Sequence, residues 1–323
     1  MRILSGIQPS GRPHLGNYFG ALRQYITLQK GNEPFYFIAS YHALTAVQEP
    51  ALLREYTMGV ALDLLALGLD PKQAALFAQQ DVPEVTELTW ILSCVTPMGL
   101  LERAVSYKDK VAQGLTPNHG LFAYPVLQAA DILIYLSELV PVGQDQKQHL
   151  EMTRDIAGKF NQQFGEVFVI PKPYILESTA VVPGVDGRKM SKSYGNEIGI
   201  FEEGNALKKR VMSIVTDSAP VEAPKDPHQS TPFLLLSLLA SAEEKAEWES
   251  RYEAGGMGYG EVKKRLLQLV EEYFAPFRQR RHELEKDTDY VMDVLKDGGM
   301  RARAVAQQVM HRVREATGLP TSY

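Results

Sequence analysis

The alternation of short apolar runs with helical stretches over the first hundred residues most constrains the fold. Apolar runs lie at 2–7, 35–40 and 74–79, and the helical stretches follow them at 18–29, 50–67 and 85–96. Strands that alternate with helices pair in parallel, because each helix carries the chain back across one face of the sheet. The sequence therefore predicts an α/β fold with a doubly wound parallel sheet, which binds ligands at the carboxyl ends of its strands.

The second half of the chain is dominated by helices. Helices are predicted at 121–136 and 144–164, with a short strand at 139–142 between them. The segment 171–196 is rich in Pro, Gly, Ser and Lys, which is typical of a loop. Beyond about residue 230 the pattern is helical throughout. We therefore predict two domains: an α/β domain over 1–195 and an all-α domain over 196–323.

Composition excludes several classes of protein. The 34 Lys and Arg residues against 39 Asp and Glu give a net charge of −5, which argues against indiscriminate coating of nucleic acid. Cys94 is the single cysteine, so a disulfide or a cysteine-based metal site within one chain is excluded, and we expect it in the core. The sequence has no signal-peptide pattern and no apolar run long enough to span a membrane, which predicts a cytoplasmic protein without a membrane partner.

A polar segment at 8–17 lies between the first strand and the first helix. Gly16 lets a ligand approach the backbone closely, and a helix N-terminus offers free N–H groups to a phosphate. His14 and Asn17 can donate further hydrogen bonds. The segment is a candidate phosphate site, and a simple connecting turn is the alternative.

The segment GRKMSKSYGN at 187–196 is basic and rich in small hydroxyl residues. Lys189 and Lys192 stand three positions apart, and lysine acts in such a loop as a point charge with rotatable donors. The pattern suits a mobile clamp on an anionic group; a solvated basic loop without a ligand is the alternative.

A third polar segment, at 142–146, again joins a strand to a helix. Asp145 would lie in the first helical turn, where the helix dipole favours a carboxylate. The segment is either a helix cap without a ligand or part of a polar cluster for a ribose or an amino group.

Together, these segments resemble the class I aminoacyl-tRNA synthetases. A Px₄HxGN turn after the first strand, followed much later by KMSKS at 189–193, corresponds to the HIGH and KMSKS motifs of that family. Further stretches are similar to the bacterial tryptophanyl-tRNA synthetases: GIQPSGxxHLGNYFGALRQ at 6–24, HALT at 42–45, YPVLQAADIL at 124–133, VPVGQDQKQHLEMTRDIAGKFN at 140–161 and DGRKMSKSYGN at 186–196. The resemblance extends from the N-terminus to about position 215 and continues more weakly into the helical tail.

The resemblance implies a Rossmann-like catalytic domain and a helical anticodon-binding domain. It implies an enzyme that activates L-tryptophan with ATP to tryptophanyl-adenylate and pyrophosphate, and then transfers the acyl group to tRNA(Trp). The nucleophile is the ionised carboxylate of the amino acid, so catalysis rests on positioning and charge stabilisation. Mg²⁺ is expected to bridge the phosphate oxygens of ATP, with no protein ligand identified.

The resemblance also assigns site residues. Those implied to line the ATP site are Gln8, Pro9, Ser10, His14, Gly16, Asn17, Gly143, Gln144, Asp145, Lys189, Met190, Ser191, Lys192 and Ser193. Those implied to take part in catalysis are Lys189, Lys192, Ser191, Gln8 and Asn17. Those implied to bind tryptophan are Asp131, His42, Tyr124, Gln128, Val140, Val142, Gln146 and Leu4.

Asp131 matches the family aspartate that accepts the indole N–H, so phenylalanine, which has no donor, should be rejected strongly. Two positions depart from other members of the family: Gln128 replaces Met and Leu4 replaces Phe. Tyr124, Gln128 and Asp131 form a YxxxQxxD pattern that is similar to the pocket of tyrosyl-tRNA synthetases. A tyrosine–tRNA ligase is therefore an alternative, although the HLGN motif and its QPSG lead-in favour tryptophan.

A non-catalytic tRNA-binding paralogue is a second alternative, and it should have lost the phosphate donors that this chain retains. The helical tail carries basic residues that could contact the anticodon: Arg301, Arg303, Arg312 and Arg314, and the Lys and Arg residues of 261–282. Members of the family are symmetric dimers, so a homodimer is expected. DNA is not an expected partner.

Overall fold

The computed structural model describes residues 1–104, 114, 118–143, 146–175 and 181–320. Contacts divide the chain into two compact units, each assembled from separated segments. The first unit comprises Met1–Gly11, Tyr25–Leu176 and Lys286–Tyr323, and the second comprises Arg12–Gln24 and Glu177–Glu285. The division of functions near residue 195 stays a prediction.

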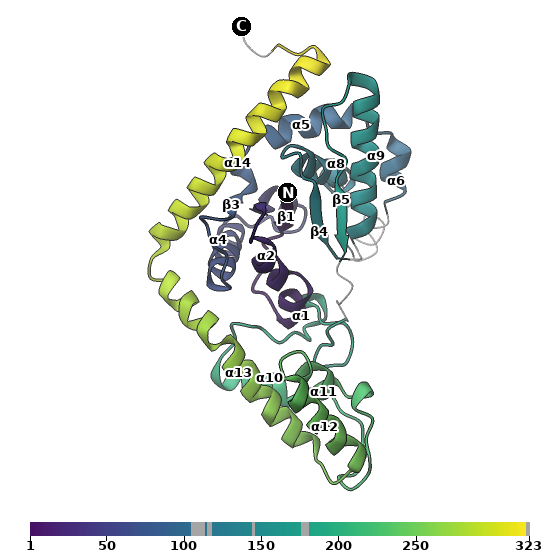
Figure 1. Ribbon diagram of the computed structural model, residues 1–323, viewed down its shortest axis with the longest axis vertical. Helices are drawn as coiled ribbons and strands as arrows, with labels where there is room; N and C mark the ends of the chain where they lie inside the picture. Colours follow the sequence, from purple (N-terminus) through teal and green to yellow (C-terminus); the bar gives the residue numbers. More distant parts are fainter. Residues whose placement is uncertain (105–113, 115–117, 144–145, 176–180, 321–323) are drawn as a thin grey trace. The chain divides into compact units, whose positions relative to one another are not determined.

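A five-stranded parallel sheet is the centre of the first unit, in the order β3-β2-β1-β4-β5 (Figure 1). Its strands are β1 (Arg2–Ile7), β2 (Glu33–Ile38), β3 (Ala75–Ala78), β4 (Leu139–Val142) and β5 (Lys172–Ile175). All residues of β2 after Glu33 are buried, the pattern of a strand covered on both faces. The strand order reverses between β1 and β4, and sheets of this type bind ligands at such a switch point.

Strand β5 corrects the prediction that 171–196 is all loop. Pro173 pairs with Val140 of β4, in parallel register. Proline cannot donate to a sheet ladder, so it is found in edge strands, where the missing donor is tolerated. The Pro-rich composition therefore hid a strand at the edge of the sheet.

Helices surround this sheet (Figure 1). The helices of the first unit are α2 (Arg23–Leu28, which begins in the second unit), α3 (Ser40–Ala43), α4 (Pro50–Ala66), α5 (Glu84–Ser93), α6 (Met98–Glu102), α8 (His119–Leu133), α9 (Lys147–Phe164) and α14 (Thr288–Thr317). The side chain of Asn118 caps α8 by accepting from Leu121 N, and Gly165, at φ +94°, ends α9. The first predicted helix, 18–29, is a π-helical turn (Tyr18–Leu22) followed by α2, and the short helix α1 (Leu15–Asn17) precedes it.

The C-terminal helix α14 packs directly on strand β3 (Figure 1). A Cβ atom at Gly298 would overlap the backbone of Leu76, and one at Gly299 would lie 3.0 Å from Asp81 Cβ. The Gly-Gly pair therefore brings the helix backbone against the strand, at a distance that a larger residue would prevent.

Four arginines bind α14 to other elements of the first unit. Their contacts are Arg301 to Pro71 O and Ala74 O, Arg303 to Glu84, Arg312 to Val167 O, and Arg314 to Glu87. These are the arginines that the sequence grouped as candidate RNA contacts. Each makes an intramolecular bond, and contact with RNA stays a prediction.

The second unit is helical apart from its loops. Its helices are α1 (Leu15–Asn17), α10 (Gly204–Met212), α11 (Thr231–Leu236), α12 (Ala242–Ala254) and α13 (Tyr259–Leu284). Helix α13 packs on α10 and α11, and the buried guanidinium of Arg278 donates to Ile200 O at 3.0 Å. Tyr18 packs edge-on to Phe274 and its hydroxyl lies 2.9 Å from that of Tyr273, so α13 anchors the turn that contains α1.

Cys94 is exposed, contrary to the expected core position. It follows α5, whose buried face is formed by Val85, Leu88, Ile91 and Leu92, and it lies outside that face.

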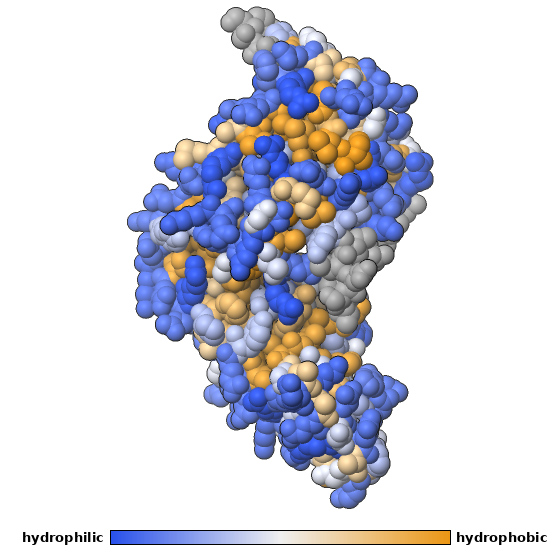
Figure 2. Space-filling view, viewed as in Figure 1, coloured by the Kyte–Doolittle hydropathy of each residue, from blue (hydrophilic) through white to orange (hydrophobic). Residues whose placement is uncertain are grey.

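No helix among the described residues is long and apolar enough to cross a membrane. Hydrophilic residues predominate on the surface along α14 in the view of Figure 2.

Candidate active site

Asp131 is the most deeply buried charged side chain of the candidate pocket, at 2% exposure. It lies near the end of α8, one turn after the half-buried Gln128 and two turns after the buried Tyr124. Spacings of i, i+4 and i+7 place these three side chains on one face of the helix. Burial raises the pKa of Asp131, and hydrogen bonds from His42 and Gln79 act in the opposite direction.

Two donors hold the Asp131 carboxylate. His42, in the short helix α3 that follows β2, places Nε2 2.9 Å from Oδ2. Gln79, at the end of β3, donates from Nε2 to Oδ1 at 2.8 Å and to Oδ2 at 2.9 Å. A carboxylate accepts hydrogen bonds only, so His42 carries its proton on Nε2 here. The carboxylate is therefore oriented from the ends of two neighbouring strands.

Tyr124 begins a second chain of hydrogen bonds beside Asp131. Its hydroxyl lies 2.9 Å from His149 Nε2, and His149 Nδ1 lies 3.0 Å from Gln146 Oε1. Because the amide oxygen of Gln146 only accepts, Nδ1 carries the proton and Tyr124 donates to Nε2. The Tyr124 and His42 rings meet edge to face, with centroids 6.1 Å apart. The two sets of hydrogen-bonded side chains therefore meet and form one polar wall, which consists of Asp131, His42, Gln79, Tyr124, His149 and Gln146.

Leu4 and Val140 lie on the neighbouring strands β1 and β4, and both are buried in the hydrophobic core of the first unit. Ala130 and Ile132, on either side of Asp131, belong to the same core cluster. A buried acceptor bordered by apolar side chains suits a large aromatic ring that carries a single donor. Of the residues predicted to bind tryptophan, hydrogen bonds and ring contacts link Asp131 with His42, His42 with Tyr124, and Tyr124 with Gln146 through His149. The roles of Gln128, Leu4 and Val140 stay predictions. The side chain of Val142 lies outside the described residues.

The carboxyl ends of β1 and β4 lie beside each other at the switch point. Gln8, Pro9 and Ser10 follow β1 directly; Gln8 and Ser10 are exposed and Pro9 is buried. Gly143 follows β4 and is also exposed. Gln144 and Asp145, predicted to hold adenine and ribose, lie outside the described residues. Gln8, Ser10 and Gly143 therefore lie at the carboxyl ends of the strands, the position that the topology favours for a ligand.

The HLGN turn in the second unit is a capping box. Asn17 N donates to His14 Nδ1 at 3.2 Å, and His14 N donates to Asn17 Oδ1 at 3.1 Å. His14 is buried, and burial, followed by the charge of Lys192, lowers the pKa of His14 to about 4. Its ring is therefore neutral at pH 7, with the proton on Nε2. A Cβ atom at Gly16 would lie 3.0 Å from that ring, so glycine is needed for the ring to pack over the turn.

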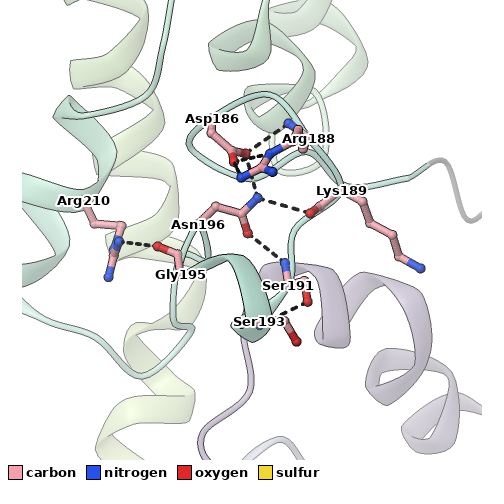
Figure 3. A network of polar contacts seen from close by, with 8 residues as sticks. All are labelled: Asp186, Arg188, Lys189, Ser191, Ser193, Gly195, Asn196 and Arg210. Carbon is pink, nitrogen blue, oxygen red and sulfur yellow. Dashed lines mark hydrogen bonds and ion pairs between the residues drawn. The ribbon is translucent and has the colours of Figure 1, made fainter. Parts of the chain in front are cut away.

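Asn196 organises the loop that contains KMSKS (Figure 3). Its Nδ2 donates to Asp186 Oδ1 at 2.6 Å and to Lys189 O at 3.2 Å, and its Oδ1 accepts from Ser191 N at 2.8 Å. It is 2% exposed, and a side chain at Gly184 would overlap it. Three points of the loop are thereby fixed by one side chain.

The predicted phosphate donors Lys189 and Lys192 differ in their exposure within this loop. Lys189 is exposed and its side chain extends away from the Asn196 network in Figure 3. Lys192 begins a short 3₁₀ turn that Ser191 caps by accepting from Ser193 N at 3.3 Å. Met190 is buried at 4% exposure, so the loop inserts one apolar anchor between two polar residues.

Backbone pairing joins the HLGN turn to the segment after KMSKS. Leu15 N donates to Ile198 O at 3.0 Å, Ile200 N donates to Pro13 O at 3.2 Å, and His14 bridges Gly199 in antiparallel register. The two motifs, far apart in the sequence, therefore lie together within the second unit. The sequence predicted both motifs but not the pairing that unites them.

Four polar residues of the site were not singled out from the sequence: Gln79, His149, Asp186 and Asn196. Asp186 and Asn196 fall within the DGRKMSKSYGN stretch, and His149 within VPVGQDQKQHLE, so the motifs contained them without their roles. Gln79 had no sequence signal beyond its place after an apolar strand. Among the described residues, no three His, Cys, Asp or Glu side chains are placed to hold a metal ion.

Comparison with known proteins places these features in a family. The family model for class I tRNA synthetases of tryptophan and tyrosine matches residues 1–275. The chain belongs to this family. The match includes both motifs and the polar wall, and the Rossmann-like fold with a helical C-terminal region is confirmed.

Two curated relatives in this class I family cover nearly the whole chain. The tryptophan–tRNA ligase of Rhodopirellula baltica is 59% identical over 99% of this chain and 100% of its own length. The tryptophan–tRNA ligase of Fusobacterium nucleatum is 54% identical over 98% of both chains. Among solved structures, the tryptophanyl-tRNA synthetase of Campylobacter jejuni, complexed with ADP and tryptophan, has a TM-score of 0.94 and 48% identity, over 99% of this chain and 100% of that chain.

Proposed function

We propose that this class I synthetase is a tryptophan–tRNA ligase. It activates L-tryptophan with ATP and transfers the product to tRNA(Trp). The observation that carries the proposal is the identity of 59% and 54% to curated tryptophan–tRNA ligases over nearly the full chain. The buried Asp131 carboxylate, held by His42 and Gln79, gives that identity a chemical basis.

Tryptophan is selected by its indole N–H. Asp131 accepts that N–H, and Leu4 and Val140 cover the ring. A buried carboxylate left without its donor is destabilised by about 1–3 kcal/mol or more, which disfavours phenylalanine. Tyr124, His149 and Gln146 form the other end of the polar wall, where the α-ammonium group of the substrate can donate.

Activation is a displacement at the α-phosphorus of ATP. A carboxylate oxygen of tryptophan forms a bond to phosphorus as the bond from phosphorus to the bridging oxygen breaks, and pyrophosphate leaves with the electron pair. No proton has to be removed from the nucleophile, so no general base is assigned. The protein acts by holding the two reactants in line and by stabilising charge on the leaving group.

The two motifs of the second unit stabilise that charge. Lys189 and Lys192 bear on the β- and γ-phosphates as point charges. Neutral His14 donates from Nε2, and the amide of Asn17, whose oxygen is used in the capping box, has its N–H₂ group to donate. By resemblance to the family, Gln8, Ser10 and Gly143 are also assigned to the nucleotide.

ATP enters as its magnesium complex. Mg²⁺ holds few protein ligands when it bridges phosphate oxygens, and it is proposed here as part of the substrate. The same proposal includes a cytoplasmic location and tRNA(Trp) as the acceptor of the acyl group.

The proposal also includes a homodimer. Trp90 at 73% exposure and Met98 at 62% give α5 and α6 a large apolar surface among the described residues. Exposed aromatic and sulfur-containing side chains are typical of protein interfaces. Sedimentation equilibrium should give twice the mass of one chain, and a mass of one chain would refute this part of the proposal.

Charging assays test the proposed function. Purified protein with ATP, Mg²⁺ and labelled tryptophan should charge a tRNA(Trp) transcript and leave a tRNA(Tyr) transcript uncharged. Charging of tRNA(Tyr) with tyrosine would assign the tyrosine alternative. Binding of tRNA without charging of either transcript would assign the non-catalytic paralogue.

A further inference from the structure

Gln79 is a buried glutamine whose whole amide group is engaged in the pocket. It is 1% exposed and lies at the start of the 3₁₀ turn Gln79–Asp81, directly after β3. Its Nε2 donates to both oxygens of Asp131, and its Oε1 accepts from Tyr41 N at 2.9 Å. A single side chain thus links α8 to α3.

The orientation of this amide follows from its partners. A backbone N–H can only donate, so the group that faces Tyr41 N must be the amide oxygen. The N–H₂ group then faces Asp131, where it meets an acceptor. Exchanging oxygen and nitrogen would set two donors against each other at Tyr41 and two acceptors against each other at Asp131. Gln79 therefore presents a fixed donor to the carboxylate.

The bonds around Asp131 are unequal between its two oxygens. Among the described contacts, Oδ2 accepts from His42 and Gln79, whereas Oδ1 accepts from Gln79 alone. A carboxylate oxygen has two acceptor positions. Oδ1 therefore retains one, with its direction set by the amide of Gln79.

The turn that presents Gln79 is itself fixed within the first unit. Asp81 Oδ2 accepts from Ala78 N at 3.1 Å, closing the turn, and Gly299 of α14 lies against Asp81. A side chain held on a rigid element loses little further freedom when a ligand binds. This rigidity suits Gln79 to positioning.

We propose that Gln79 is a positioning residue for amino-acid selection: it holds the Asp131 carboxylate so that Oδ1 receives the indole N–H. The assignment rests on the proposed tryptophan–tRNA ligase activity. It adds a residue that acts through Asp131 and does not touch the reacting atoms. Its loss should raise KM for tryptophan and reduce discrimination against a ring that lacks the N–H.

The test measures ATP–pyrophosphate exchange with tryptophan and with its benzothiophene analogue, in which sulfur replaces the indole N–H. Gln79→Met keeps the length of the side chain and removes the amide. We expect KM for tryptophan to rise about ten-fold or more, kcat to change less than about three-fold, and the preference for tryptophan over the analogue to fall about ten-fold. In Asp131→Asn, adding Gln79→Met should cause no further fall in that preference.

Gln79→Glu separates the two ends of the amide. It keeps an acceptor for Tyr41 N and places an oxygen where the donor to Asp131 stood, so discrimination should fall as in Gln79→Met. Gln29→Met is the matched control, because Gln29 is also buried, donates to Gly68 O and accepts from Asp70 N, outside the pocket. It should leave the preference unchanged, even where thermal stability falls.

The possible outcomes separate the two proposals. If the wild-type protein shows no exchange with tryptophan, the proposed function fails. If the wild type prefers tryptophan and both Gln79 variants retain the full preference, the function stands and the role of Gln79 is refuted. If Gln29→Met lost the preference for tryptophan to the same extent, the effect of Gln79→Met would reflect a general loss of structure. The positioning role of Gln79 would then also be refuted.

Discussion

Asp131 and His14 are both buried, and burial shifts their pKa values in opposite directions. The charged form is disfavoured in each case, so the pKa of the Asp131 carboxyl rises and the pKa of the His14 ring falls to about 4. The hydrogen bonds that Asp131 receives from His42 and Gln79 favour its ionised form, which is the form that only accepts hydrogen bonds. His14 needs no such help, because a neutral ring is the form that can both accept from Asn17 N and donate from Nε2.

The shift at His14 predicts a pH dependence of stability. The pKa in the folded chain is about 4, against about 6.5 when unfolded, so between these values the unfolded chain binds more protons. The contribution of His14 is present above pH 6.5 and is lost as pH falls towards 4. His14→Gln, which does not titrate, should reduce the slope of unfolding free energy between pH 6.5 and 4.5, by at most about 1.4 kcal/mol per pH unit. Urea unfolding of both proteins across this range measures it; parallel slopes would contradict a neutral buried ring.

Lys192 provides a prediction about rate. Removing its charge with Lys192→Ala should lower the rate of adenylate formation about 100-fold or more, because it acts where charge builds on pyrophosphate. Tryptophan affinity, measured by calorimetry, should change less than three-fold. Lys245→Ala, in the exposed face of α12, is the control and should retain the wild-type rate. A Lys192→Ala protein with normal rate would remove that lysine from the mechanism.

At the scale of elements, the KMSKS loop owes its form to one buried amide. Asn196→Ala removes the bonds to Asp186, Lys189 O and Ser191 N together. The exchange rate should fall about ten-fold or more while tryptophan affinity is kept, because the pocket belongs to the other unit. Asn32→Ala, which removes side-chain bonds to Leu28 O and Lys30 O in a surface loop, should leave the rate unchanged. Stopped-flow measurement of activation makes the comparison, and equal rates for both variants would contradict this role.

Helix α14 gives a stability prediction. A methyl group at Gly298 would overlap the backbone of Leu76, and a strand in the sheet cannot yield as a flexible side chain can. Gly298→Ala should therefore lower the free energy of unfolding by about 1–3 kcal/mol. Gly158→Ala, in the helix α9 with open space around its Cβ position, should be neutral or stabilising by up to about 1 kcal/mol. Denaturant unfolding measures both; a neutral Gly298→Ala would mean that α14 packs elsewhere.

Elements were predictable from sequence where local pattern determines them. The strands at 2–7 and 139–142 agree with β1 and β4, because dense apolar runs between turn residues have one stable form. Strand β5 was not predictable, since Pro173 is allowed only by its edge position, which is a property of the assembled sheet. The prediction that Cys94 is buried was wrong for the same reason. Its sequence neighbours are apolar, but the side of the helix end on which it lies depends on packing.

At the scale of the whole molecule, the chain forms its units from separated segments. Residues 12–24 leave the first unit for the second, and α14 returns to the first after α13. Contacts such as Arg314 with Glu87 join distant parts of the sequence, and no local pattern in one sequence indicates them. The fold class and the family were predictable, because the motifs resemble those of a known family, whereas the roles of the individual site residues stay predictions. The supporting residues Gln79 and Asn196 needed the structure.

The central claim is that this chain selects tryptophan and activates it with ATP. The most direct measurement is ATP–pyrophosphate exchange with each of the twenty amino acids in turn, at matched concentrations, using the wild-type protein and Asp131→Asn. We predict exchange stimulated by tryptophan in the wild type, and a large loss of that stimulation in Asp131→Asn. Exchange stimulated by tyrosine and not by tryptophan, or exchange with neither, would contradict the account.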